Sequence, residues 1–302
     1  MTASSARSLK VLVAAAKEPR HTVLRRIKPR RAVRSLRADD DPRASAIATA
    51  IADAVSGDAP PDERSWIERI EKLRRRLYAS AEKLDVVDYG AGSADMSLSA
   101  EQMYEGRTIE TTVGERAARA SQPPQWCLLL MRLVRELEPA SCLELGTSVG
   151  MSAAYQAAAL ELAGKGELVT IEGSPAVADL ARANLSELGL GRVEVRTGRF
   201  QDVLDELLRE RAPIDYAFID GHHDEQATVS YFRQLLPHLS DGAVLVFDDI
   251  TWSAGMRRAW RAILDEEAVT ASADLEDVGI CVVEGAGRPA PAVATGQASE
   301  GR

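Results

Sequence analysis

Short apolar runs alternate with longer amphipathic stretches through the second half of the chain, and this alternation constrains the fold more than any other feature. The apolar runs have the length of buried strands and lie at 141–146, 167–173, 193–198, 214–221 and 242–249. The stretches between them have helical length and lie at 149–163, 175–188, 201–210 and 225–239. A further helix at 254–266 and two strands at 268–274 and 279–283 follow. Because buried strands separated by such helices form βαβ units, we predict an α/β fold with a doubly wound, mostly parallel sheet of seven strands.

Glycine and acidic residues mark the ends of the predicted strands. Ligands of doubly wound sheets bind outside the carboxyl ends of the strands, so these positions are the first place to look for function. The strand ends carry Glu144 with Gly146, Glu172, Gly198, Asp220, and Asp248 with Asp249. Four of the five strand ends therefore bring carboxylates to one edge of the sheet.

The pentapeptide G-T-S-V-G at 146–150 matches the turn that presents the serine nucleophile of an α/β-hydrolase. Such an enzyme also needs an acid and then a histidine on later strand ends. The histidines of the chain are His21, His222, His223 and His238. The first precedes Ser148, the pair follows the fourth strand directly, and no H-G-G-G-type oxyanion loop precedes the serine. The sequence therefore disfavours a hydrolase.

The same turn suits a bound nucleoside. Gly146 and Gly150 let the backbone approach a ligand, and the following helix offers free N–H groups. For an adenosyl group with an amino-acid tail, we expect Glu144 near the ammonium group and Ser152 near the carboxylate. Glu172, at the end of the next strand, is placed to accept both ribose hydroxyls.

These residues resemble the class I S-adenosylmethionine (SAM)-dependent methyltransferases, especially the branch of catechol-type and macrolide-sugar O-methyltransferases. The likeness covers about 110–284. L-E-L-G-T-S-V-G-M-S resembles the first motif, L-V-T-I-E-G the ribose motif, G-R-F-Q-D the stretch bordering the adenine, and T-V-G-E at 112–115 the entry segment. The resemblance implies cofactor contacts from Val113, Glu144, Gly146, Ser148, Gly150, Ser152, Glu172, Phe200, Gln201 and Asp220.

The resemblance also implies a metal site and a catalytic base. I-D-G-H-H at 219–223 and F-D-D at 247–249 match its metal-binding positions, so Asp220, Asp248 and Asp249 are the expected ligands. Three carboxylates suit a hard ion, and Mg²⁺ is the first choice. Catechol-type enzymes usually have Asn as the third ligand and Lys as the base, whereas Asp249 and His223 stand here, as in the sugar-type relatives. Asp248 and Asp249 as helix caps, and His222 and His223 as surface turn residues, are the alternatives.

We therefore expect a Mg²⁺-assisted O-methyltransferase, with His223 and Asp220 as catalytic residues, that acts on a hydroxyl of a sugar or phenolic secondary metabolite. One alternative is a metal-independent small-molecule methyltransferase of the same fold. Another is a nucleic-acid methyltransferase that docks through a basic arm. The fourth strand, however, ends in I-D-G-H-H and not in the N/D-P-P-Y/F type of motif that grips a flipped base.

Charge and composition divide the chain into regions. Residues 1–43 carry 12 Lys/Arg against 4 Asp/Glu and are expected to form a basic, flexible arm, whereas the remainder has a net charge of −17, which disfavours nucleic-acid binding. We predict a helical region at 44–109, a methyltransferase domain at 110–284 and a disordered tail at 285–302. A stripe of Trp66, Ile70, Leu73, Leu77 and Leu84 needs a partner, which is either the main domain or a second copy in a homodimer.

Cysteine usage and hydropathy bear on the compartment. Cys127, Cys142 and Cys281 stand singly in apolar surroundings, which is typical of reduced core residues and favours a cytoplasmic protein. No apolar stretch approaches the roughly 20 residues of a membrane span.

Overall fold

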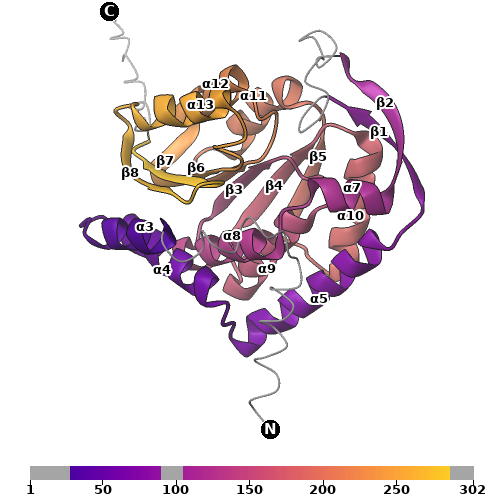
Figure 1. Cartoon of the computed structure of the whole chain (residues 1–302), viewed down its shortest axis with the longest axis horizontal. Helices are drawn as coiled ribbons and strands as arrows, with labels where there is room; N and C mark the ends of the chain where they lie inside the picture. Colours follow the sequence, from indigo (N-terminus) through magenta and orange to yellow (C-terminus); the bar gives the residue numbers. More distant parts are fainter. Residues whose placement is uncertain (1–27, 90–104, 286–302) are drawn as a thin grey trace, which may run out of the picture.

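A seven-stranded sheet runs through the centre of the computed structural model, which describes residues 28–89 and 105–285 (Figure 1). Its order is β5-β4-β3-β6-β7-β9-β8. The strands are β3 (Ser141–Leu145), β4 (Glu167–Glu172), β5 (Val193–Thr197), β6 (Ile214–Ile219), β7 (Leu239–Phe247), β8 (Val269–Asp274) and β9 (Gly279–Val283). Strands β3 to β7 pair in parallel, and β9 pairs antiparallel with both β7 and β8. The predicted doubly wound, mostly parallel sheet is confirmed.

Helices cover both faces of the sheet. They are α8 (Pro124–Leu137), α9 (Met151–Ala163), α10 (Pro175–Leu188), α11 (Phe200–Arg211), α12 (Glu225–Leu235) and α13 (Ala254–Leu264). Successive residues of a strand point to opposite faces of the sheet. Phe218 belongs to the core cluster that includes residues of α8, α9 and α10, whereas Ile219 belongs to the cluster that includes residues of α11, α12 and α13. Burial on both faces explains why the strands read as continuous apolar runs.

The first three helices of the described residues are α3 (Lys28–Arg37), α4 (Pro42–Ser56) and α5 (Pro61–Tyr78). Helix α4 packs on α8, and α5 packs on α9. A flexible arm is expected at 1–43 from the charge, whereas Leu36 of α3 is 2% exposed and α3 contacts α4 and β8. Residues 1–27 and 286–302, which make up the rest of the expected arm and nearly all of the expected tail, lie outside the described residues.

The apolar stripe of α5 finds its partner within the chain. Ile70, Leu73 and Leu77 are buried in the same core cluster as α8 and α9, and Trp66 packs against it. Leu84 lies in a strand, because α5 ends at Tyr78. The stripe thus covers the main domain and gives no argument for a second copy.

An antiparallel hairpin was missed within the region expected to be helical. Strands β1 (Lys83–Asp88) and β2 (Arg107–Thr112) pair with Val86 opposite Ile109. The signal was present, since both segments are rich in the β-branched residues Val, Ile and Thr. Helix α7 (Val113–Ala120) follows at once, capped reciprocally by Thr112 and Glu115, and α8 begins at Pro124.

No helix in the described part of the chain is long and apolar enough to cross a membrane.

Candidate functional site

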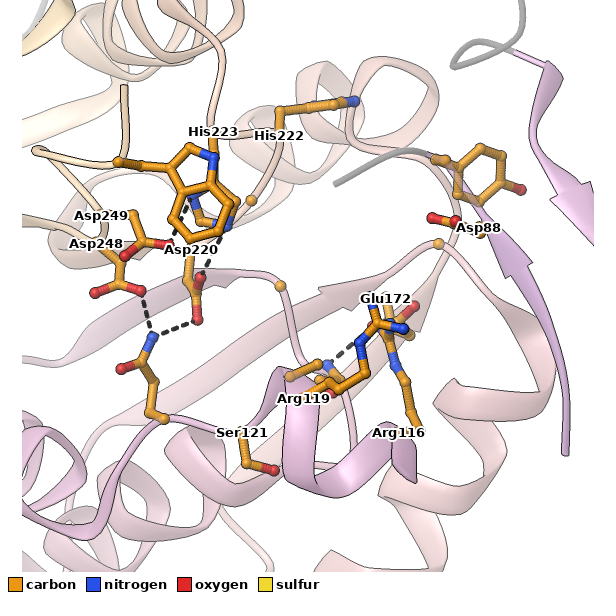
Figure 2. A pocket seen from close by; sticks show the side chains of 18 of the residues that line it. Asp88, Arg116, Arg119, Ser121, Glu172, Asp220, His222, His223, Asp248 and Asp249 are labelled. Carbon is orange, nitrogen blue, oxygen red and sulfur yellow. Dashed lines mark hydrogen bonds and ion pairs between the residues drawn. The ribbon is translucent and has the colours of Figure 1, made fainter. Parts of the chain in front are cut away.

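A cavity of about 830 Å³ opens at the carboxyl ends of the central strands. Its walls come from the ends of β3, β4, β6 and β7, and from β1, β2 and α7 on the opposite side (Figure 2). Most of the residues singled out in the sequence line it: Gly146, Ser148, Glu172, Phe200, Gln201, Asp220, His223, Asp248 and Asp249. The cavity therefore lies outside the carboxyl ends of the strands, where ligands of doubly wound sheets are expected to bind.

The glycine turn at 146–150 lies on the floor of this cavity. Gly146 has φ of 109°, and a Cβ there would lie 2.0 Å from the backbone oxygen of Asp220, so only glycine fits. Ser148 also has positive φ, at 48°, and its backbone N–H donates to Glu172. Its hydroxyl oxygen is buried, and no described residue hydrogen-bonds to it. Without a histidine to accept its proton, Ser148 lacks the activation a nucleophile needs.

Glu172 closes the neighbouring strand end and organises two turns. Its Oε2 accepts from the Ser148 N–H at 2.9 Å, and its Oε1 accepts from the Ser174 N–H at 2.9 Å. A carboxylate oxygen has two lone-pair sites, so each oxygen keeps one acceptor site after these bonds. The side chain lines the cavity although the residue is only 7% exposed.

Two residues of the first motif, Glu144 and Ser152, are buried and lie outside the residues that line the cavity. Glu144 is 0% exposed and accepts from Thr170 Oγ1 at 2.6 Å and Gln156 Nε2 at 3.1 Å. Burial raises the pKa of Glu144 to about 7. Ser152 is 4% exposed, and its hydroxyl bonds to the same carboxylate. Strand alternation explains this position, because the Glu144 side chain faces α9, where Gln156 donates to it.

Gly150 and Val113 also lie outside the cavity lining. Gly150 caps α9 with φ of 87°, and a Cβ there would meet Ala181 and Leu185 of α10 at 3.6 Å. Val113 is 3% exposed, and its N–H donates to the Glu82 carbonyl oxygen. These two residues fix the helix starts that border the cavity.

Phe200 opens α11 and packs edge-on against two rings, those of His222 and Tyr231, with centroids 5.6 Å away in each case. The imidazole Nδ1 of His222 hydrogen-bonds to the Tyr231 hydroxyl, and burial lowers the pKa of His222. His222 is thus a neutral packing residue of this aromatic cluster. Phe200 and Gln201 keep a face on the cavity.

Asp220, Asp248 and Asp249, which we name the acid cluster, meet because β6 and β7 are neighbours in the sheet. The side-chain amide of Gln122 bridges two of them: its Nε2 donates to Asp220 Oδ2 at 2.9 Å and, by a short contact, to Asp248 Oδ2 (Figure 2). Burial, with the charges of its two neighbours, raises the pKa of Asp248 well above its usual range. Burial raises the pKa of Asp249 as well. The cluster thus brings together three carboxyl groups at a place where burial disfavours their charged forms.

His223 lies against the acid cluster, unlike its neighbour His222. Its Nε2 is 3.6 Å from Asp220 Oδ1, and its Nδ1 is 3.6 Å from Asp249 Oδ2. Both histidines have positive φ, 63° at His222 and 38° at His223, and in Figure 2 His222 points away from the aspartates. The turn therefore brings one imidazole to the acids and buries the other among aromatic rings.

Within residues 28–89 and 105–285, no three His, Cys, Asp or Glu side chains are arranged to hold a metal ion as they stand. The amide nitrogen of Gln122 hydrogen-bonds to an oxygen of Asp220 and to an oxygen of Asp248. Gln122 was missed in the sequence, where nothing in its neighbourhood marks it. Arg116, Arg119 and the hairpin residues of the cavity wall were missed too.

Comparisons with known proteins agree with this geometry. Residues 143–250 match a family model described as a methyltransferase domain. The chain is 33% identical over 165 residues to a catechol O-methyltransferase of Mycobacterium tuberculosis, which covers 54% of this chain and 69% of that relative.

Solved structures resemble the chain as well. An O-methyltransferase from Bacillus cereus in complex with SAH has a TM-score of 0.50 at 24% identity, over 73% of this chain and 90% of that one. TomG from Streptomyces achromogenes, an O-methyltransferase involved in tomaymycin synthesis and solved with SAM, has a TM-score of 0.47 at 29% identity, over 55% and 82%. The Bacillus structure shares the fold.

Proposed function

Because the chain belongs to the class I SAM-dependent O-methyltransferases, we propose that it methylates a hydroxyl of a small sugar or phenolic molecule with the help of a divalent cation, Mg²⁺ first. One observation carries the proposal: the acid cluster and His223 face the same cavity as the glycine turn and Glu172. An acceptor hydroxyl beside the acids and a cofactor beside the turn would then meet within one enclosed space.

SAM, when bound, supplies a methyl group on a positively charged sulfur. Glu172 would accept the two ribose hydroxyls on the lone pairs that its backbone bonds leave over. Phe200 and Gln201 would border the adenine, and Gly146 would let the tail pass close to the backbone beside Asp220.

His223 would accept the proton of the acceptor hydroxyl. Neutral imidazole is a suitable base near pH 7, and the two carboxylates 3.6 Å away would stabilise the imidazolium that forms. Trp252 lines the same end of the cavity and is 56% exposed, so its ring is available to an aromatic or sugar ring.

The donor set fits a hard cation. Asp220, Asp248 and Asp249 offer only oxygen ligands, which a hard cation such as Mg²⁺ prefers, and all three line the same cavity. Mg²⁺, when bound there, would supply a Lewis acid that lowers the pKa of the acceptor hydroxyl.

Gln122 also favours a second candidate, a metal-independent O-methyltransferase. Its amide already joins Asp220 and Asp248, so the two carboxylates have a partner without any cation. In that case His223 alone would handle the proton.

Chelation separates the two candidates. Methyl transfer from radiolabelled SAM to a panel of catechols, phenols and glycosides is measured before and after EDTA, with Mg²⁺ added back. Loss with EDTA and recovery with Mg²⁺ supports the metal-assisted enzyme, and unchanged turnover supports the metal-independent one. Titration of Mn²⁺ followed by electron paramagnetic resonance gives a readout without turnover: Asp220→Asn should weaken Mn²⁺ binding, and Asp241→Asn, outside the cavity lining, should not.

A further inference from the structure

Helix α7 turns one polar face toward the cavity. Arg116, Arg119 and Ala120, spaced three and four residues apart, line it, whereas Val113 and Ala117 of the same helix are buried in the core. In Figure 2 both arginine side chains extend from this helix into the cavity. The helix thus places the two positively charged guanidinium groups of Arg116 and Arg119 at the cavity wall, where a ligand of the cavity can reach them.

These arginines differ from the other described arginines of the cavity wall. Arg107 pairs with Asp88, and Arg199 pairs with Asp202. Arg116 has a buried Nε for which no hydrogen-bond partner exists among the described residues. A buried donor left without an acceptor costs about 1–3 kcal/mol, so its position indicates an acceptor that arrives with a ligand.

Arg119 strengthens the same indication. Its closest acidic neighbour on the helix is Glu115, one turn earlier. The Glu115 carboxylate already accepts from the Thr112 N–H at 3.1 Å and from Thr111 Oγ1 at 3.0 Å as part of the helix cap. Two guanidinium groups on one helix face therefore have room for an external anion.

The position of the pair selects which anion. Both side chains reach toward Glu172 and away from the acid cluster (Figure 2), and the Glu172 carboxylate accepts from the Ser148 N–H of the glycine turn. With the ribose on Glu172, the amino-acid tail of the cofactor would lie over that turn. Ser152, the side chain expected from the sequence to meet its carboxylate, is buried against Glu144 instead.

We infer that Arg116, assisted by Arg119, binds the α-carboxylate of the methionine part of SAM. The inference rests on the proposed cofactor orientation, with Glu172 at the ribose. A guanidinium matches a carboxylate with two parallel N–H···O bonds, which adds direction to charge. Arg116 is then a residue that holds the tail, and so directs the sulfonium toward the acid cluster.

Calorimetry with two ligands tests this assignment. S-adenosylhomocysteine carries the carboxylate, and 5′-methylthioadenosine shares the nucleoside and the sulfur but lacks the amino-acid tail. Arg116→Met should raise the Kd of the first roughly 10- to 100-fold and leave the Kd of the second within about twofold. Arg119→Met should give a smaller loss of the same kind, and Arg116→Lys should restore part of it. Arg107→Met is the matched control, because Arg107 lines the same cavity but is paired with Asp88.

Several outcomes overturn the inference. Equal losses for both ligands in Arg116→Met would mean a damaged cavity, and an equal effect in Arg107→Met would mean general electrostatics. Unchanged binding of both ligands with a raised KM for an acidic acceptor would assign the arginines to the acceptor's carboxylate. If the wild-type chain itself fails to bind S-adenosylhomocysteine, the proposed function fails with it, whereas wild-type binding that Arg116→Met leaves intact refutes only the arginine assignment.

Discussion

Replacing Glu172 by Gln alters a carboxylate that holds two backbone N–H groups and that would also bind the cofactor in the proposed site. Gln keeps the shape but has one acceptor oxygen, so it can satisfy the N–H of Ser148 or of Ser174, and its amide nitrogen faces the other N–H. One charge-assisted bond is lost and one buried donor is orphaned, which together cost about 3 kcal/mol in the free energy of unfolding. The ribose loses at least one charged acceptor, worth about 2 kcal/mol, or roughly a 30-fold rise in Kd.

Two measurements keep these effects apart. Urea denaturation without ligand reports the stability loss, and calorimetry with S-adenosylhomocysteine at low temperature, where the variant is folded, reports the Kd. Glu144→Gln is the matched control: it is an equally buried, isosteric change outside the cavity, and its Kd should stay within about threefold of the wild type. A Glu172→Gln protein that binds as tightly as the wild type refutes the ribose assignment. An equal loss in both variants shows that a loosened turn, and not a lost ribose contact, weakens binding.

Three further predictions follow from named contacts. His223→Ala should lower kcat on any accepted hydroxyl about 10²- to 10⁴-fold without altering affinity for S-adenosylhomocysteine, and a mild kcat effect with a changed affinity would contradict its role as base. Arg132 is 6% exposed and lies 2.7 Å from the buried Glu63 carboxylate. Arg132→Met leaves that carboxylate without its cation and should lower the free energy of unfolding by about 3–5 kcal/mol, and adding Glu63→Gln should recover part of this loss. Urea denaturation of both variants checks this. The folded-state pKa of Glu144, about 7, lies above its ordinary 4.5, so its contribution is complete below pH 4.5 and is lost as the pH rises through 7. Wild-type stability should therefore fall by up to about 3 kcal/mol more than that of Glu144→Gln across this window, and parallel pH profiles of the two proteins would disprove it.

The main features of the sheet could be predicted because they are local. A strand segment buried on both faces must be apolar throughout, as 216–219 and 243–247 are, and the helices between such strands force parallel pairing. Parallel strands end at one edge, so Asp220 at the end of β6 and Asp248 at the end of β7 had to come near each other once the two strands became neighbours.

The sequence did not predict the features that depend on the direction of a side chain or on contacts between residues far apart in the chain. Glu144 and Glu172 both read as acids near strand ends, but Glu144 stands two residues before its turn and faces α9, whereas Glu172 ends its strand and faces the cavity. The hairpin β1–β2 carried a recognisable β-branched pattern, but its place as a cavity wall depends on contacts such as the Val87 N–H with Ser174 Oγ at 3.1 Å, 87 residues away.

The sequence by itself determined the layered α/β architecture, the edge at which function lies and the acids that gather there, since each depends on periodicity and on chain order. Only the tertiary structure decided that the α5 stripe covers the main domain and that Gln122 bridges two aspartates. It also decided that His223 and not His222 meets the acids, and that Arg116 and Arg119 line the same cavity as the glycine turn. These facts depend on contacts between residues far apart in the chain, as between Gln122 and Asp248, which are 126 positions apart. No local pattern encodes such a pairing, because it exists only after both elements have packed on the same sheet.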